Sequence, residues 1–188
     1  MSTPGSIAEV LELYERRGAE HYGEDVSQLA HALQCAALAS ASRAADELVA
    51  AALLHDIGHL VVDHRGSTID EPARDDHHEA VGARILAGLF GAAVAAPVAL
   101  HVTAKRWRSA VDPDYRSTLS AASNLSLAAQ GGPLNDDERA RFEAHPASAN
   151  AVALRAWDDA AKDPAAATPS LRDYEVLLTA LARTAAHT

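Results

Sequence analysis

The stretch LVAAALLHDIGH, residues 48–59, decides how this chain folds. Seven apolar residues lead directly into an imidazole and a carboxylate, His55 and Asp56, so a buried helix is expected to end on two polar groups that need partners. Neighbouring residues on a helix point about 100° apart, so both side chains can serve one site only where the helix stops. We expect Gly58 to stop it, because glycine readily adopts the left-handed turn of a helix end. A buried His–Asp hydrogen bond is also a common structural feature, so this pair alone leaves a structural and a functional role open.

The rest of the chain also favours helices. Hydrophobic residues make up 48% of the 188 residues but aromatic residues only 4%, so alanine and leucine, which favour helix over strand, carry the core. Ser27, Asn135 and Asp46 or a neighbour are expected to cap helices, and residues 61–75 are expected to form a surface loop. The expected helices span about residues 6–18, 27–40, 48–56, 78–90, 94–105, 114–119, 121–129, 135–142, 147–158 and 170–184.

Charge and cysteine content exclude several classes of partner. The net charge is −10 and no basic run is visible, so the chain would repel nucleic-acid backbones. No segment has a signal-peptide pattern or reaches about 18 apolar residues, which predicts a cytoplasmic protein with no membrane partner. The single cysteine, Cys35, lies among apolar residues and predicts a buried thiol. A small anionic substrate remains compatible with the charge, because metal ions and a lysine can reverse the sign locally.

The histidines indicate a metal site. His31, His78 and His101 each lie among Ala, Leu and Val on separate predicted helices. Taken singly, such a histidine is more often a hydrogen-bonded core residue. Taken together they favour metal binding, because helical bundles build metal sites from inward-pointing His and carboxylate side chains on different helices. The candidate ligands are His31, His55, Asp56, His78, His101 and Asp158.

This ligand set predicts both the kind of metal and its use. Four imidazoles and two carboxylates suit iron, manganese, cobalt or zinc, and six ligands shared by two ions leave positions open for catalysis. We therefore expect one all-α domain over residues 1–188, a helical bundle with a dinuclear metal site in its core. Its expected parts are an N-terminal helix and loop (1–25), a metal-binding helical core (26–160) and a C-terminal helix (170–184).

Several motifs make the chain resemble a known family. His31 followed by His55-Asp56-Ile57-Gly58-His59 resembles the HD-domain superfamily in its His-Asp-Ile-Gly form. The further motifs are similar to those of the PhnZ-like, phosphonate-degrading HD-domain oxygenases, over about residues 20 to 175. These motifs are His78-Glu79-Ala80-Val81-Gly82-Ala83, His101-Val102-Thr103-Ala104-Lys105-Arg106, Leu119-Ser120-Ala121-Ala122-Ser123, Gln130-Gly131-Gly132-Pro133 and Arg155-Ala156-Trp157-Asp158.

The resemblance implies a diiron oxygenase. Such an enzyme uses an Fe(II)/Fe(III) pair and O2 to cleave the carbon–phosphorus bond of a small 1-hydroxyphosphonate, such as a 2-amino- or 2-trimethylammonio-1-hydroxyethylphosphonate, giving a carboxylic acid and phosphate. Position by position, it implies one iron on His31, His55, Asp56 and Asp158. Asp56 would bridge to the second iron on His78 and His101. His77 competes with His78, but the His-Glu-x-Val-Gly-Ala pattern begins at His78.

The resemblance also implies a substrate site. His59 and Lys105 are candidate donors to the phosphonate, and Lys105 follows His101 by four residues, on the same helix face. The candidates for neutral hydrogen bonds are Ser123, Ser126 and Gln130. Glu24 would lie near a cationic substrate tail. Each of these also has an ordinary interpretation, as a helix residue, a surface charge or a loop acid.

One position departs from the family pattern. Where family members commonly carry a tyrosine that occupies an iron position until substrate arrives, this chain has His21, followed by Tyr22. Either residue could serve as the gate, or the gate is absent.

Two other functions compete with the oxygenase. A metal-dependent phosphohydrolase acting on a nucleotide or phosphate monoester would use a metal-activated hydroxide, and a non-catalytic HD module would bind a ligand or partner. The intact ligand set disfavours the second of these. We expect a monomer or a small homo-oligomer.

Overall fold

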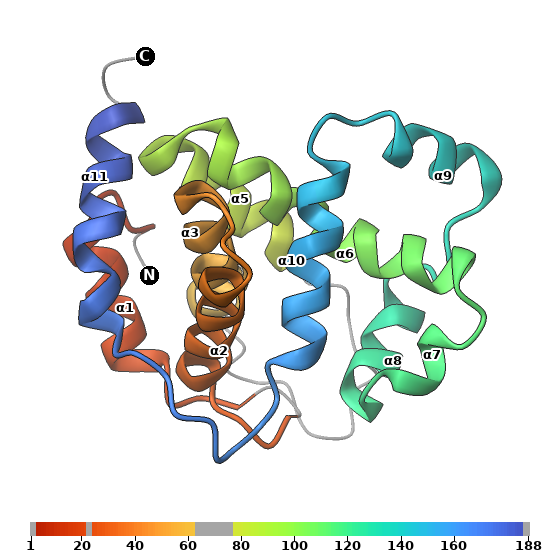
Figure 1. The fold of residues 1–188 in the computed structure, drawn as a ribbon, viewed down its shortest axis with the longest axis horizontal. Helices are drawn as coiled ribbons and strands as arrows, with labels where there is room; N and C mark the ends of the chain where they lie inside the picture. Colours follow the sequence, from red (N-terminus) through yellow and green to blue (C-terminus); the bar gives the residue numbers. More distant parts are fainter. Residues whose placement is uncertain (1–2, 22–23, 63–76, 186–188) are drawn as a thin grey trace.

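The computed structural model describes residues 3–21, 24–62 and 77–185, and this part of the chain is helical with no strand (Figure 1). The predicted all-α class is confirmed. The elements are α1 (Ile7–Arg17), α2 (Gln28–Ala41), α3 (Asp46–Leu54), α4 (Ile57–Val61), α5 (His78–Phe90), α6 (Ala92–Val111), α7 (Tyr115–Thr118), α8 (Ala121–Ala129), α9 (Asp136–Glu143), α10 (Ser148–Ala160), the 3-10 turn η1 (Leu171–Tyr174) and α11 (Glu175–Ala185).

The centre of the molecule is built around α3. All residues of this helix from Leu48 to Leu54 are buried, and it packs against α2, α6, α10 and α11. Three of its buried positions are alanines, whose small side chains let neighbouring backbones approach closely. In Figure 1, α1 and α11 lie on one side of α2 and α3, with α10 and α6 on the other side and α7, α8 and α9 beyond them. The helix that leads into His55 therefore packs against three of the helices that carry the other candidate ligands, α2, α6 and α10.

Side-chain caps start several helices where the sequence predicts them. The Ser27 hydroxyl accepts a hydrogen bond from the Ala30 amide at the start of α2. At α9, Asn135 and Glu138 form a complete capping box, each side chain accepting the other residue's backbone N–H. These caps satisfy amides that a helix start leaves without a partner, and the predicted starts at Ser27 and Asn135 are confirmed.

Two predicted details are wrong. Gly58 does not end a helix: α3 ends at Leu54, and Gly58 lies inside α4 without a positive φ. Glycine is needed there for close approach, because a Cβ at this position would lie 2.0 Å from the His78 carbonyl oxygen of α5. Asp46 does not cap α3, since Ala45 is the N-cap residue and makes no side-chain cap. The predicted surface loop 61–75 lies mostly outside the described residues.

The remaining helices cover this core. The main buried cluster draws on α1 to α6, α10, η1 and α11, and a smaller cluster of Ala104, Leu134, Phe142 and Ala151 holds α9 against α6 and α10. Within the described ranges, no helix is both long enough and apolar enough to span a bilayer.

Candidate metal centre and substrate cavity

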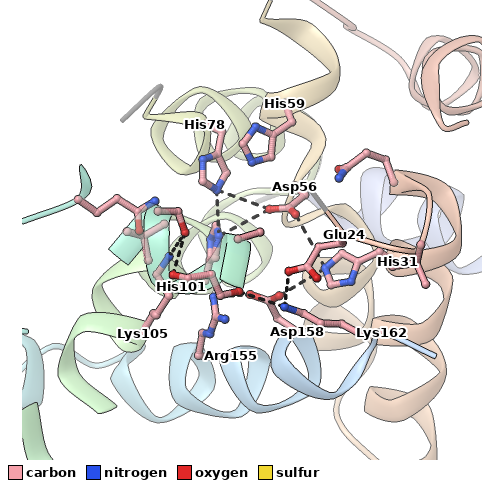
Figure 2. A pocket seen from close by; sticks show the side chains of 17 residues that line it. Glu24, His31, Asp56, His59, His78, His101, Lys105, Arg155, Asp158 and Lys162 are labelled. Carbon is pink, nitrogen blue, oxygen red and sulfur yellow. Dashed lines mark hydrogen bonds and ion pairs between the residues drawn. The ribbon is translucent and has the colours of Figure 1, made fainter. Parts of the chain in front are cut away.

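The structure brings the six candidate ligands together from four helices and the α3–α4 junction (Figure 2, in which His55 is not drawn). His55 and Asp56 lie between the end of α3 and the start of α4, so the helix break lets adjacent side chains face one site. His78 is the first residue of α5. The others come from α2 (His31), α6 (His101) and α10 (Asp158). The four histidines and Asp158 are buried, and Asp56 has a side chain only 17% exposed.

Asp56 lies between two groups of donor atoms. Its Oδ1 atom lies 3.5 Å from His78 Nε2 and 3.7 Å from His101 Nε2. The same oxygen is 3.5 Å from His55 Nε2, and Oδ2 is 3.9 Å from His31 Nε2. Such separations are long for hydrogen bonds but are those expected of neighbouring ligands that each lie about 2.1 Å from a shared ion. A carboxylate placed between two imidazole pairs has the position that a bridging ligand requires.

Asp158 completes the group around His31 and His55. Its Oδ1 atom lies 3.4 Å from His31 Nε2 and 3.9 Å from His55 Nε2. Its other oxygen, Oδ2, forms an ion pair of 2.7 Å with Arg155 Nη1. Burial opposes ionisation of this carboxyl, but the Arg155 guanidinium keeps the pKa of Asp158 well below its usual value. The arginine therefore holds one oxygen and leaves the other as an anionic donor.

Backbone contacts fix the orientation of three imidazoles. A carbonyl oxygen can only accept a hydrogen bond, so each Nδ1 atom that contacts one must carry a proton, and in the neutral ring Nε2 then keeps its lone pair. The three contacts are His31 Nδ1 to Ala161 O (2.9 Å), His55 Nδ1 to Ala52 O (2.9 Å) and His101 Nδ1 to Val98 O (2.7 Å).

The resulting arrangement fits cations. His31 Nε2 and His55 Nε2 lie 3.3 Å apart, and His78 Nε2 lies 3.2 Å from His101 Nε2. Lone pairs at this separation repel unless a proton or a cation lies between them. Burial lowers the pKa of His55 and His101, which favours the neutral imidazole that metals bind. With two carboxylates beside them, these residues fit two divalent or trivalent ions.

A cavity of about 180 Å³ opens onto this cluster. All six candidate substrate residues line it: Glu24, His59, Lys105, Ser123, Ser126 and Gln130. The His59 ring stacks on the His78 ring with centroids 3.8 Å apart, so it borders the ligand cluster directly. The cavity is small beside the 300–1,000 Å³ usual for drug-sized ligands, which favours a substrate of few atoms.

Lys105 supplies positive charge to this cavity. Its side chain is only 3% exposed, and its Nζ atom donates a 2.8 Å hydrogen bond to the Ser126 hydroxyl. Within the described part of the chain no carboxylate forms an ion pair with it. Burial, together with repulsion from Arg155, lowers the pKa of Lys105 to about 8. A buried ammonium that donates to a hydroxyl and forms no ion pair within the described residues is suited to bind an anion.

Sequence reasoning missed two residues of the cavity. The Arg155-Ala156-Trp157-Asp158 motif predicts no role for Arg155, although this residue is 4% exposed and contacts Asp158, Asp159 and the Tyr115 hydroxyl. Lys162 lies outside the motifs, yet it reaches the cavity and pairs with Glu24. One signal was available: the chain has only two lysines, and both line this one cavity.

Other candidates lie away from the cluster. The His21 side chain is exposed and its Nδ1 atom lies 3.2 Å from the Glu24 carbonyl oxygen, so it does not reach the cluster here. Tyr22 lies outside the described residues, and the gate stays a prediction. The His77 side chain is 71% exposed, in contrast to buried His78. Cys35, in contrast, borders the cluster: its buried Sγ atom lies 3.7 Å from His31 Nε2, and burial raises the pKa of the thiol.

Comparisons with known proteins agree with this site. The HD domain family model matches residues 19–160, so the chain belongs to the HD-domain family, as predicted. A hydroxymethylphosphonate dioxygenase from Gimesia maris is 46% identical over 173 residues, which cover 92% of this chain and 86% of that protein. A 1-hydroxy-2-(trimethylamino)ethylphosphonate dioxygenase (glycine-betaine-forming) from Leisingera caerulea is 38% identical over 167 residues, covering 88% of this chain and 85% of its own length.

Proposed function

We propose that this protein is an Fe- and O2-dependent oxygenase that cleaves the carbon–phosphorus bond of a small 1-hydroxyphosphonate to give a carboxylate and phosphate. The relatives' names imply the use of oxygen on hydroxyphosphonates. The observation that carries the proposal for this chain is one small cavity that joins five of the six candidate metal ligands to a buried lysine. Metal donors and an anion-binding group in one cavity are what oxidation of a phosphonate requires.

The reaction balances without a further reductant. One oxygen atom of O2 is added to carbon and the other to phosphorus, so the carbinol carbon becomes a carboxylate and phosphate leaves, with one proton released. O2 accepts the four electrons. A mixed-valent iron pair, held by His31, His55, Asp56, His78, His101 and Asp158, would supply this redox chemistry when bound.

The protein's own residues would bind and orient the substrate. The Lys105 ammonium would donate charge-assisted hydrogen bonds to phosphonate oxygens, with Ser126, to which it is already bonded, beside it. Gln130 and His59 line the same cavity and would add neutral donors. Arg155 would keep Asp158 in place through its ion pair at Oδ2. Because Lys105 and Arg155 are buried and the other three residues are half-buried, few waters would compete with the phosphonate.

Metal loading tests the proposed ligands. The variants His78→Ala and Asp158→Ala should bind about one metal ion fewer, or none, by elemental analysis of protein loaded anaerobically with Fe(II). His77→Ala is the matched control, since it removes the adjacent but exposed imidazole, and it should keep the full stoichiometry. Full stoichiometry in both ligand variants would contradict the metal centre.

Activity and spectroscopy test the reaction. Iron-loaded, partly oxidised protein should show a low-temperature EPR signal of a coupled half-integer spin that changes when a hydroxyphosphonate is added. Phosphate should then appear only after O2 is admitted. Oxygen-independent phosphate release from a nucleotide with Mn(II) or Co(II), and no such signal, would instead establish the metal-dependent phosphohydrolase.

A further inference from the structure

One end of the cavity, opposite Lys105, holds an ion pair between two side chains of the protein, Glu24 and Lys162. Lys162 Nζ lies 2.6 Å from Glu24 Oε1, 3.1 Å from Ser120 Oγ and 3.0 Å from Ser123 Oγ. The Ser120 hydroxyl donates to the same Glu24 oxygen at 2.6 Å. An ammonium has three N–H donors, and here three acceptors surround it. Lys162 therefore has its hydrogen-bonding capacity used within the protein; Figure 2 shows its side chain beside Glu24 and Asp158.

The position of Lys162 is fixed by its neighbours in the chain. The preceding residue, Ala161, accepts the hydrogen bond that orients His31. The following residue, Asp163, exchanges two backbone hydrogen bonds with the Gln34 side chain, at 2.9 and 3.0 Å. The segment is thus tied to α2 on both sides of the lysine. The ammonium is a fixed part of the cavity wall, and the side chain is only 21% exposed.

Glu24 would otherwise attract a cation. A carboxylate lining a cavity is a natural partner for an ammonium or quaternary ammonium group, and the Leisingera relative is named for a substrate with a trimethylamino group. In this chain the carboxylate is already neutralised by Lys162. A cationic tail would have to break that ion pair and would then lie beside a like charge, which disfavours it.

We propose that Lys162 determines specificity by occupying, as a cation built into the protein, the end of the cavity where a cationic tail would lie. The proposal rests on the proposed function and narrows it to hydroxyphosphonates with no cationic tail, of which hydroxymethylphosphonate is the smallest. The volume of about 180 Å³ agrees with a short substrate. Lys105, on the other side of the cavity, remains the group that receives the phosphonate.

The test compares two substrates on the iron-loaded enzyme. We expect kcat/KM for O2-dependent phosphate release to be about 100-fold higher for hydroxymethylphosphonate than for 1-hydroxy-2-(trimethylamino)ethylphosphonate, the size of a like-charge penalty. Lys162→Met keeps the length of the side chain and removes the charge, leaving Glu24 free for a cation. In this variant, the ratio of kcat/KM for hydroxymethylphosphonate to kcat/KM for the trimethylammonium compound should fall at least tenfold. Anaerobic calorimetric titration with each phosphonate should show the same change in Kd without turnover.

Matched variants separate specificity from folding. The double variant Glu24→Gln/Lys162→Met removes both charges and should accept hydroxymethylphosphonate without gaining affinity for the trimethylammonium compound. Arg172→Met removes the exposed ion pair with Glu15 and should leave the substrate ratio unchanged. If Lys162→Met does not fold, Lys162→Gln provides the same comparison with a polar side chain.

The two proposals fail in different ways. O2-dependent phosphate release from neither compound would overturn the proposed function. Release from both compounds with a ratio near one, or a ratio unchanged in the lysine variants, would overturn the role of Lys162 while leaving the oxygenase intact.

Discussion

The two ends of the cavity contain the same residue type in opposite electrostatic conditions. Lys105 is only 3% exposed, and its ammonium donates a hydrogen bond to the Ser126 hydroxyl. Lys162 is more exposed and is bound to a carboxylate and two hydroxyls. Figure 2 shows the two side chains on different sides of the ligand cluster. One positive charge is left available to a ligand, whereas the other is cancelled by the protein.

This difference shows that a lysine's role in a cavity depends on its partners more than on its presence. A charge buried without a counter-ion destabilises the folded chain, and an anionic ligand relieves that cost when it binds. A charge that is already paired gives a ligand little further stabilisation and instead excludes other cations. Three predictions separate the two lysines.

The largest expected effect is on turnover. Lys105→Met should lower kcat/KM for hydroxymethylphosphonate by about 100-fold or more, because it removes the charge that receives the phosphonate. Lys162→Met should lower it by less than about tenfold. Steady-state phosphate release under air, at equal iron content, measures both. Equal losses in the two variants would contradict the division of roles.

The second effect is on stability without metal. Burial depresses the pKa of Lys105 from 10.5 to about 8, so between these two pH values the unfolded chain binds more protons than the folded one. The folding stability should therefore rise with pH across this window as Lys105 loses its proton. Below pH 8 the charged Lys105 destabilises the folded protein by its full amount. At pH 7, Lys105→Met should stabilise the metal-free protein by about 2 kcal/mol, because it removes the buried charge. A lowered pKa costs at most about 1.4 kcal/mol of folding stability per pKa unit.

Urea unfolding at pH 7 and pH 10 provides the measurement, with Lys162→Met as the comparison. That variant should be less stable than the parent by about 1 kcal/mol or less, since it removes a partly exposed ion pair. A Lys105→Met protein that is less stable than the parent at pH 7 would show that the buried ammonium does not destabilise the folded protein.

The smallest effect is on the pH profile. Raising the pH from 7.5 to 9 deprotonates most of Lys105 if its pKa is about 8, and kcat/KM for hydroxymethylphosphonate should fall by up to roughly eightfold. Lys105→Arg keeps its charge throughout and should show a flatter profile, whatever its absolute rate. In Lys162→Met, kcat/KM should fall over this pH range by the same factor as in the parent enzyme. A fall in kcat/KM of the same size in Lys105→Arg would show that another titrating group causes it.

Much of the fold could be predicted from local sequence. Alanine and leucine at helical spacing gave the helices, and Ser27 and Asn135 gave helix starts, because capping depends on groups within a few residues. The family resemblance, through the His-Glu-x-Val-Gly-Ala pattern, favoured His78 over His77, whose side chain the structure leaves exposed. The candidate ligands were also readable from sequence: His31, His78 and His101 each lie among apolar residues, His55 and Asp56 follow an apolar helix, and Asp158 belongs to a motif that the family resemblance supplies.

The sequence by itself determined the helices, the donor types and the family, because these depend on residue identity and short spacing. Only the tertiary structure decided the rest. Gly58 is required by the approach of α5, which no local pattern shows. Glu24 and Lys162 are 138 residues apart in the chain and meet only when α2 and α10 pack together. Which lysine keeps its charge available and which is neutralised depends on neighbours that folding supplies, so the electrostatics of the cavity is a property of the packed molecule.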